Sequence, residues 1–315
     1  MSTIDSDLPR EFCARLPAIM GPAQALTALQ YLREPRPVAW RVNRLLSTAQ
    51  EVVQSFQAAG ICWHPGWCDS SGWAPAEFRD RVTRHPMAEQ GHIYIQGLAS
   101  QFASILLAPQ PGEVVLDLAA APGGKASHLA ELMGNQGELC VVEPIRSRFF
   151  RLRANLQRLG VTHARYYMTD GRTVGKKVPN KFDRVMLDAP CSSESRFRSG
   201  QPDTYHTWSL RKIRECQRKQ FGLIRSAFQA LKPGGTMVYG TCSFAPEENE
   251  QVVAHLLEQF PGEVDILPVE LPPPIAVPGL TSFQGRDFPS AMVHCRRMIP
   301  SEQFDGFFFA LLVKR

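Results

Sequence analysis

Two cysteines of this 315-residue chain stand where a thiol could take part in chemistry. Cys191 and Cys242 each follow closely on an apolar run that predicts a strand, and each is followed by a serine. A structural cysteine more commonly lies inside a strand, as Cys140 does in the run 137–142. Because the carboxyl ends of parallel strands meet at one edge of a sheet, we expect the two thiols to share a crevice there.

Carboxylates accompany the predicted strands in the same way. Asp117, Glu143, Asp170 and Asp188 each lie at or near the end of an apolar run. Taken alone, Asp170 is more simply interpreted as a helix cap or a turn residue. Together with the two cysteines, the set predicts a single crevice lined by acids and thiols.

A glycine-rich turn adds a ligand site to that crevice. The turn 122–124 joins the apolar run 114–118 to an amphipathic pattern that begins at Lys125. Backbone N–H groups and the positive end of the helix dipole then face the crevice. Glu143 lies 20 residues after Gly123, about where an acid binds a ribose hydroxyl in nucleotide-binding βαβ units. An adenosine-containing cofactor is therefore predicted, and the alternative is a turn that only caps the helix.

The elements that must position these residues alternate between strands and helices. This alternation predicts a Rossmann-like α/β fold with a doubly wound, mainly parallel sheet. A last strand at 307–313 would pair with 291–298 as an antiparallel edge. Residues 1–90 are expected to form a small α/β domain, and residues 91–315 the sheet domain. The strands are predicted at 114–118, 137–142, 164–168, 182–187 and 236–240, and the helices at 98–107, 125–133, 146–160 and 211–231.

The composition is that of an ordinary soluble protein. Hydrophobic residues make up 44% and charged residues 21% of the chain, and no apolar run is long enough to span a bilayer. The eight cysteines include no C-x-x-C pair, which argues against a zinc site or a disulfide framework. No signal-peptide pattern opens the chain. We therefore expect a cytoplasmic protein with reduced thiols, no metal and no membrane contact.

The net charge of +5 is unevenly distributed. Residues 144–184 contain 11 Lys and Arg against 2 Asp and Glu, whereas residues 247–270 contain 7 acids and no Lys or Arg. A basic segment of this kind favours a polyphosphate partner such as a nucleic acid. The alternative is a solvated helix face that has no partner.

The motifs together resemble the NOL1/NOP2/Sun family of RNA cytosine-C5 methyltransferases, which use S-adenosyl-L-methionine. The most specific matches are the Pro-Cys motif at 188–192 and the Thr-Cys motif at 239–243. The resemblance implies methylation of C5 of a cytidine in structured RNA, with residues 1–90 contacting the RNA. The other matching stretches are 8–9, 41–43, 94–96, 99–100, 117–125, 155, 158–160, 231–235, 247–250 and 305–308.

The resemblance implies a reason for two thiols. Cys242 would add to C6 of cytosine, which makes C5 enamine-like and able to attack the methyl group. Cys191 would assist the release step, in which a base removes the C5 proton and the thiol leaves. Asp188 would hydrogen-bond the amino and N3 edge of the base. Lys125 would hold Cys242 as a thiolate or contact the base.

The resemblance also implies where the cofactor binds. The turn that ends at Gly124 would contact the methionine end, and Glu143 would bind the ribose. Arg148 would lie near the cofactor, and Asp170 with Gly171 would contact the adenine. The complete set of predicted cofactor-binding residues is Ala119, Ala120, Ala121, Pro122, Gly123, Gly124, Lys125, Glu143, Arg148, Asp170, Gly171 and Asp188.

The chain departs from the family pattern in three places. Gly97 stands where the family usually has an acid, and Glu143 stands where aspartate is more common. The segment 193–198 replaces a glycine-rich turn that borders the substrate. We also expect no C-terminal RNA-binding domain, which some relatives carry.

Several alternatives concern the substrate and the class of protein. Ribosomal RNA is the expected substrate, because the front of the chain, including Trp67, Cys68 and Trp73, is most similar to the bacterial small-subunit ribosomal RNA branch, and transfer RNA is the alternative. A non-catalytic RNA-binding or ribosome-assembly protein is disfavoured by the presence of both Cys191 and Cys242. An NAD-dependent oxidoreductase is disfavoured because the turn is not G-x-G-x-x-G. A DNA cytosine methyltransferase would need only the Pro-Cys thiol. We expect a monomer.

Overall fold

A nine-stranded sheet forms the centre of the protein in the computed structural model, which describes residues 7–271 and 276–315. The strand order is β11-β14-β15-β9-β8-β5-β6-β7, and β10 also pairs with β15. The strands from β9 to β7 are parallel, whereas β15 is antiparallel to all its neighbours. The predicted mainly parallel sheet with an antiparallel edge is thus confirmed. The strands are β5 (Val114–Asp117), β6 (Glu138–Val142), β7 (Ala164–Tyr167), β8 (Phe182–Asp188), β9 (Leu231–Thr241), β10 (Val264–Leu267), β11 (Ala276–Pro278), β14 (Arg296–Met298) and β15 (Phe307–Lys314).

Strand β9 begins earlier than the sequence predicts. Helix α10 (Leu210–Ala230) is followed at once by β9, so the glycines at 234–235 do not form a separate turn. Leu231 pairs with Phe182 of β8, and the pairing shifts register before Thr236 pairs with Arg184. A pattern of Pro and Gly predicts a break, but an irregular stretch of a paired strand can also contain these residues.

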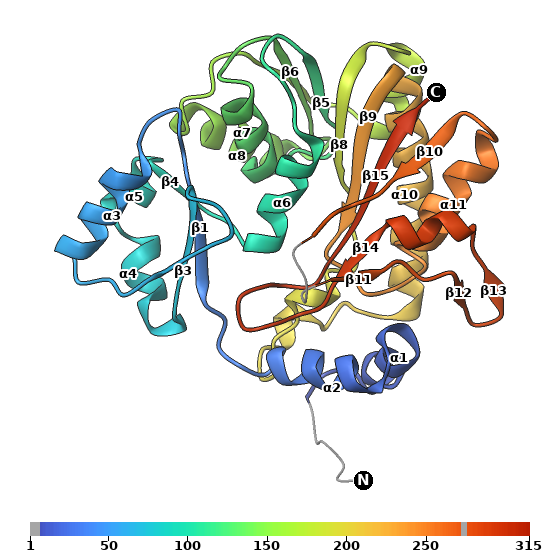
Figure 1. Cartoon of the computed structure of the whole chain (residues 1–315), viewed down its shortest axis with the longest axis horizontal. Helices are drawn as coiled ribbons and strands as arrows, with labels where there is room; N and C mark the ends of the chain where they lie inside the picture. The colour runs from blue at the N-terminus through green and yellow to red at the C-terminus, as the bar shows by residue number, and fades with distance from the viewer. Residues whose placement is uncertain (1–6, 272–275) are drawn as a thin grey trace.

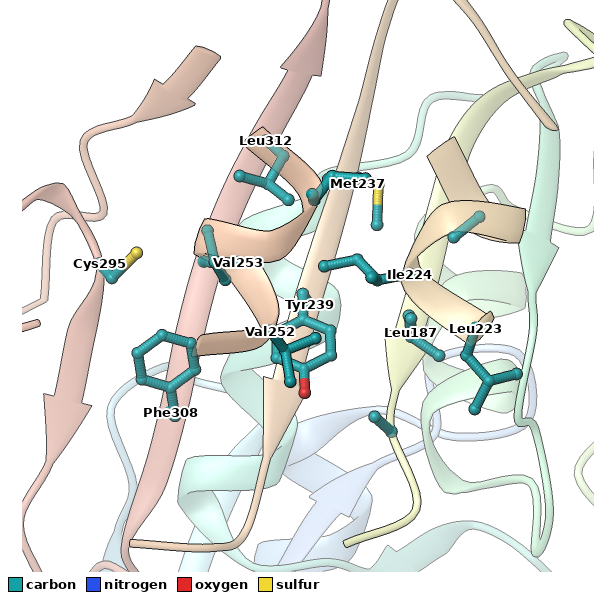
Figure 2. Close-up of a cluster of buried hydrophobic side chains, with 14 of the residues drawn as sticks. Leu187, Leu223, Ile224, Met237, Tyr239, Val252, Val253, Cys295, Phe308 and Leu312 are labelled. Atoms are coloured by element: carbon teal, nitrogen blue, oxygen red, sulfur yellow. The ribbon is translucent and has the colours of Figure 1, made fainter. Parts of the chain in front are cut away.

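Helices cover both faces of the large sheet. Figure 2 shows α10 and α11 (Glu250–Gln259) on one face, with Ile224 and Val253 packed toward Met237 and Leu312 of the strands. The opposite face carries α6 (Leu98–Leu107), α7 (Gly124–Leu132) and α8 (Arg146–Arg158). Alternate residues of a strand enter opposite cores, which explains why these strands are nearly continuous apolar runs in the sequence.

A second, four-stranded sheet lies beside the first (Figure 1), in the order β2-β3-β1-β4. Helix α3 (Ala49–Ala58) packs on it and begins with a capping box between Thr48 and Glu51. Its core contains Trp40 and Phe56, whose rings are 4.9 Å apart. The strands are β1 (Val38–Val42), β2 (His64–Pro65), β3 (Ser71–Ala74) and β4 (Ile93–Ile95), and the short helices are α4 (Arg79–Thr83) and α5 (Pro86–Glu89).

The packing of two segments crosses the predicted boundary at residue 90. Helices α1 (Arg10–Met20) and α2 (Pro22–Tyr31) lie under the large sheet (Figure 1), where the Phe12 ring is 4.9 Å from Phe197. Strand β4, which follows residue 90, pairs with β1 of the small sheet. The division into domains at 1–90 and 91–315 stays a prediction.

Within the described residues, no helix is long and apolar enough to cross a membrane, and no group of three His, Cys, Asp or Glu side chains could hold a metal ion. The start of the chain, where we expect no signal peptide, lies outside the described residues.

The remaining elements are short. They are η1 (Ala76–Phe78), η2 (Gly171–Thr173), α9 (Val174–Lys177), η3 (Glu194–Arg196), η4 (Pro202–Thr204), β12 (Ser282–Phe283), β13 (Arg286–Asp287) and η5 (Ser290–His294).

Candidate active site

A cavity of about 390 Å³ lies where β5, β8 and β9 end. Its volume is in the range of pockets that bind small molecules. Residues from the small sheet, including Tyr94, line it together with residues from the large sheet. The predicted site residues in the lining are Ala119, Ala120, Ala121, Pro122, Gly124, Lys125, Asp188 and Cys242, and those outside it are Gly123, Glu143, Arg148, Asp170, Gly171 and Cys191.

The turn after β5 requires glycine at two positions. Gly123 has a φ of +112°, a conformation that residues with side chains rarely adopt. A Cβ atom on Gly124 would lie 2.8 Å from Cε1 of Tyr94. Helix α7 begins at Gly124, so its first free N–H groups lie at the cavity and can bind an anionic or polar group.

Lys125 and Asp188 form an ion pair across the cavity. Nζ of Lys125 lies 2.6 Å from Oδ2 of Asp188 and 2.7 Å from Oγ of Ser100, and it lies 5.3 Å from the centre of the Phe307 ring. Of the two roles that the sequence suggested for Lys125, contact with a bound base is compatible with this position. Its other role, to hold Cys242 as a thiolate, stays a prediction, and the charge of Arg196 is one that lowers the pKa of Cys242.

The two thiols lie together, although 51 residues separate them. Sγ of Cys191 is 3.4 Å from Sγ of Cys242, and Cys242 is 8% exposed. A hydrogen bond from Cys191 lowers the pKa of the Cys242 thiol, and the charge of Arg196 adds to this effect against the cost of burial. The same hydrogen bond, with burial, raises the pKa of Cys191. Cys242 is therefore the thiol that ionises first.

Two buried carboxylates lie behind the thiols. Glu248 accepts hydrogen bonds from the backbone N of Ser192 (2.9 Å) and from Oγ of Ser243 (2.6 Å). Glu194 accepts one from Nε1 of Trp208 (2.8 Å), and its Oε2 lies 3.1 Å from the same Ser243 hydroxyl. The residues after both cysteines are thus held by one network, which fixes the loop and the strand that carry the thiols.

We expect Glu248→Gln to change how stability depends on pH. Burial, with the charge of Glu194, raises the pKa of Glu248 to about 7. Between the ordinary value and pH 7 the folded protein keeps a proton that the unfolded chain has released, so stability falls as pH rises through this window. A glutamine mimics the neutral carboxyl and does not titrate. The loss of unfolding free energy between pH 5 and pH 8 should shrink in the variant by up to about 3 kcal/mol.

Urea denaturation at the two pH values measures this effect. The exposed Glu263→Gln is the control, and it should keep the difference of the unaltered protein. Equal differences in Glu248→Gln and in the unaltered protein would contradict the assignment.

Glu143 and Arg148 are joined to the turn. The Glu143 carboxylate is 1% exposed, accepts a hydrogen bond from the backbone N of Ile145 (2.9 Å) and lies 3.4 Å from Nη1 of Arg148. Nη2 of Arg148 donates to the carbonyl oxygen of Ala121 (3.0 Å). The predicted ribose-binding acid is therefore connected through Arg148 to the turn that lines the cavity.

Asp170 and Gly171 lie in the loop that follows β7. Asp170 forms an ion pair with Arg172, whose Nη2 lies 2.5 Å from Oδ2. A Cβ atom on Gly171 would lie 2.9 Å from the carbonyl oxygen of Leu118, just after β5. The loop that carries Asp170 and Gly171 therefore packs against the end of β5. The Asp170 carboxylate is already paired with Arg172.

Asp117 differs from these acids because one of its oxygens has no partner. Its Oδ2 is buried without a hydrogen bond from any described residue, and the residue is 1% exposed. Burial, with the charge of Asp188, raises the pKa of Asp117 to about 7. A cationic group bound in the cavity would stabilise the ionised form.

Several residues that position the site were not assigned a role from the sequence. Ser100 and Phe307 contact Lys125, and Glu248 holds the segment after Cys191. All three lie in stretches that match the family pattern, and this match could have indicated that they belong to the site. Arg196 lies in a stretch that departs from this pattern, so no motif indicated it.

Comparisons with known proteins agree with this geometry. A family described as "16S rRNA methyltransferase RsmB/F" matches residues 104–313. The ribosomal RNA small subunit methyltransferase F of Vibrio vulnificus (strain YJ016) is 39% identical over 259 residues, which are 80% of this chain and 54% of that protein. The protein of the same name from Aliivibrio fischeri (strain MJ11) is 40% identical over 73% of this chain and 49% of its own length. The chain spans about half the length of these curated relatives.

Solved structures are similar over almost the whole chain. A methyltransferase homologue from Pyrococcus horikoshii is 31% identical, with a TM-score of 0.83 over 98% of this chain and 96% of the other. The NSun6 protein of the same organism, solved with SFG, is 20% identical with a TM-score of 0.81, and it supports the fold alone.

Proposed function

Because the chain belongs to the family described as 16S rRNA methyltransferase RsmB/F, we propose that it methylates C5 of a cytosine in RNA with S-adenosyl-L-methionine as methyl donor. Family membership confirms the resemblance noted in the sequence. The observation that carries the proposal is the contact of two thiols, 3.4 Å apart, beside a cavity that also holds the Lys125–Asp188 pair. The names of the relatives favour ribosomal RNA as the substrate over transfer RNA.

The residues around the turn fit the methionine end of the cofactor. The unpartnered oxygen of Asp117 would accept a hydrogen bond from the ammonium group, and the N–H groups at Gly124 would bind the carboxylate. Glu143 would bind the ribose, and Asp170 with Gly171 would contact the adenine once Arg172 moves from the carboxylate. S-adenosyl-L-methionine supplies an electrophilic methyl group.

The thiols would act in sequence. The Cys242 thiolate forms a bond from Sγ to C6 of cytosine, and the electrons released to C5 allow that carbon to take the methyl group. Asp188 would hydrogen-bond the amino and N3 edge while N3 takes a proton from the solvent, and this proton leaves again when the Sγ–C6 bond breaks. The C5 proton then leaves to a base and the Sγ–C6 bond breaks, which restores the aromatic ring. Cys191, in contact with Cys242, is placed to assist this last step.

The proposal also covers the part of the chain that contacts RNA, the oligomeric state and the location in the cell. The small-sheet part would contact RNA, since Tyr94 and other residues of that part line the cavity. We further propose a monomer in the cytoplasm, where ribosomal RNA is modified and where thiols stay reduced. No disulfide joins the described cysteines.

Calorimetry tests the cofactor part of the proposal. The protein should bind S-adenosyl-L-methionine or S-adenosylhomocysteine, and Glu143→Ala should weaken this binding about tenfold, since a hydrogen bond to a charged group is lost. Glu113→Ala is the control, because Glu113 pairs with Arg184 at the opposite end of the strands. Binding of NAD with no response to either methyl-cycle compound would contradict the proposal.

A further inference from the structure

Three arginines from distant parts of the sequence form one wall of the cavity. Arg36 follows α2, Arg79 begins α4, and Arg198 follows η3. All three line the cavity, as does Asp305. We call Arg36, Arg79 and Arg198 the arginine wall. Its three members lie outside the basic segment 144–184.

The arginine wall carries more positive charge than its surroundings neutralise. Oδ1 of Asp305 lies 3.8 Å from Nη1 of Arg36 and 3.5 Å from Nη2 of Arg198, so one carboxylate is shared by two guanidinium groups. Arg79 forms no ion pair with a described residue, and its Nη2 donates to the carbonyl oxygens of Arg36 and Pro37. Asp305 offsets one of the three positive charges of the wall, so the remaining charge attracts an anion to this side of the cavity.

The pKa of Arg198 reports the same imbalance. Its pKa is lowered to about 10, mainly by burial; the charges of Arg36 and Arg79 act in the same direction, and the charge of Asp305 opposes them. An arginine whose charge is disfavoured in this way gains stability when an anion binds beside it.

Arg36 also has donors that no described residue uses. Its side chain is 7% exposed, and its Nε and Nη2 are buried without a hydrogen-bond partner in the described parts of the chain. Only its Nη1 donates, to the carbonyl oxygens of Ser301 and Phe304. Buried donors of this kind normally have an acceptor, and a planar guanidinium group suits the paired oxygens of a phosphate.

We propose that the arginine wall binds a backbone phosphodiester of the RNA strand beside the target nucleotide. This inference rests on the proposed function in one respect, that the occupant is RNA. A cytosine held at Cys242 carries a phosphate on each side of its ribose, so a strand that reaches the thiol brings anions to this cavity. Arg196, which also lines the cavity, interacts electrostatically with Cys242 and with Asp305, so positive charge extends from the arginine wall to the thiol. Asp305 is the internal anion that the phosphate displaces.

Two arginines of helix α4 provide a matched test. Nη2 of Arg79 and Nη2 of Arg81 each donate to a backbone carbonyl, but Arg81 faces a different hollow, near Ala59. Binding of a labelled single-stranded oligoribonucleotide is measured at several salt concentrations. Arg79→Gln should weaken binding about tenfold and reduce the slope of log affinity against log salt by about 0.7, the contribution of one phosphate contact. Arg81→Gln should change neither quantity.

Asp305→Asn should have the opposite effect. Removal of the competing carboxylate should strengthen binding of the same oligoribonucleotide several-fold and make the salt slope steeper. Unchanged or weaker binding in this variant, or equal behaviour of Arg79→Gln and Arg81→Gln, overturns the inference.

The cofactor carboxylate is the other anion that could occupy the wall. If Arg79→Gln loses affinity for S-adenosylhomocysteine and keeps its affinity for RNA, the phosphate assignment is wrong. A failure of the proposed function is a separate result. A protein that binds the oligoribonucleotide through Arg79 but transfers no methyl group would keep this inference and refute the activity.

Discussion

Cys242→Ala is expected to abolish RNA methylation, by about 10⁴-fold or more, and to leave no covalent species between protein and RNA. Without this thiol no bond to C6 can form, so C5 stays too weak a nucleophile to take the methyl group. The structure supports Cys242 as the attacking thiol because Cys191 and Arg196 both lower its pKa.

Cys191→Ala should give a different defect. The adduct through Cys242 still forms and takes the methyl group, but its resolution is impaired. An RNA–protein conjugate that survives denaturing electrophoresis should therefore accumulate. Loss of the hydrogen bond from Cys191 also removes the main cause of the low pKa of Cys242, so the adduct should form more slowly near neutral pH.

The double variant decides the order of the two steps. Adding Cys242→Ala to Cys191→Ala should remove the conjugate, because attack precedes release. The exposed Cys62→Ala is the control and should behave as the unaltered protein. If Cys242→Ala accumulated the conjugate and Cys191→Ala abolished it, the two roles would be reversed. If neither single variant changed methylation, the mechanism with two cysteines would be wrong for this chain.

Asp188→Asn is expected to lower kcat by about 10²- to 10⁴-fold with little change in KM for RNA. The carboxylate would stabilise the base mainly when the ring becomes protonated during attack, so its loss weakens the transition state more than the ground state. The variant also leaves the buried ammonium group of Lys125 with Ser100 as its remaining hydrogen-bond partner.

Asp183→Asn is a matched control for this variant. Both acids lie in β8, and each forms an ion pair of 2.6 Å, Asp188 with Lys125 and Asp183 with Lys232 at the other end of the strand. Single-turnover methylation should separate the two variants, since only Asp188 lines the cavity. Urea denaturation checks folding, and each variant should lose less than about 3 kcal/mol because both acids are partly exposed. Equal rates in the two variants would contradict the role of Asp188.

The sequence by itself determined most of the large sheet. Strands buried on both faces are short apolar runs, and the helices between them have a period near 3.6, so each is visible locally. The motifs at Cys191 and Cys242, each at a strand end, also identified the edge at which the cavity lies. The sequence did not determine the start of β9, because pairing with β8 extends that strand through residues that usually break one.

The basic segment 144–184 illustrates a limit of counting charges. Five of its cations pair with carboxylates, namely Arg148, Arg165, Arg172, Lys181 and Arg184. None of the segment's cations lines the cavity, whose arginines are Arg196 and the three members of the arginine wall. A window of sequence sums charges that are near in the chain, whereas electrostatic energy depends on distance in space.

Only the tertiary structure decided which residues meet in the site. The ion pair between Lys125 and Asp188 joins a helix start to a strand end 63 residues away, and Asp305 reaches Arg36 across 269 residues. These contacts depend on how loops leave the sheet and on how the small sheet packs beside it. Periodicity describes the burial of a residue within its own element and contains no information on the direction of a loop. The chemistry of single residues was therefore readable from the sequence, while their distances and shared charges were fixed by packing between elements.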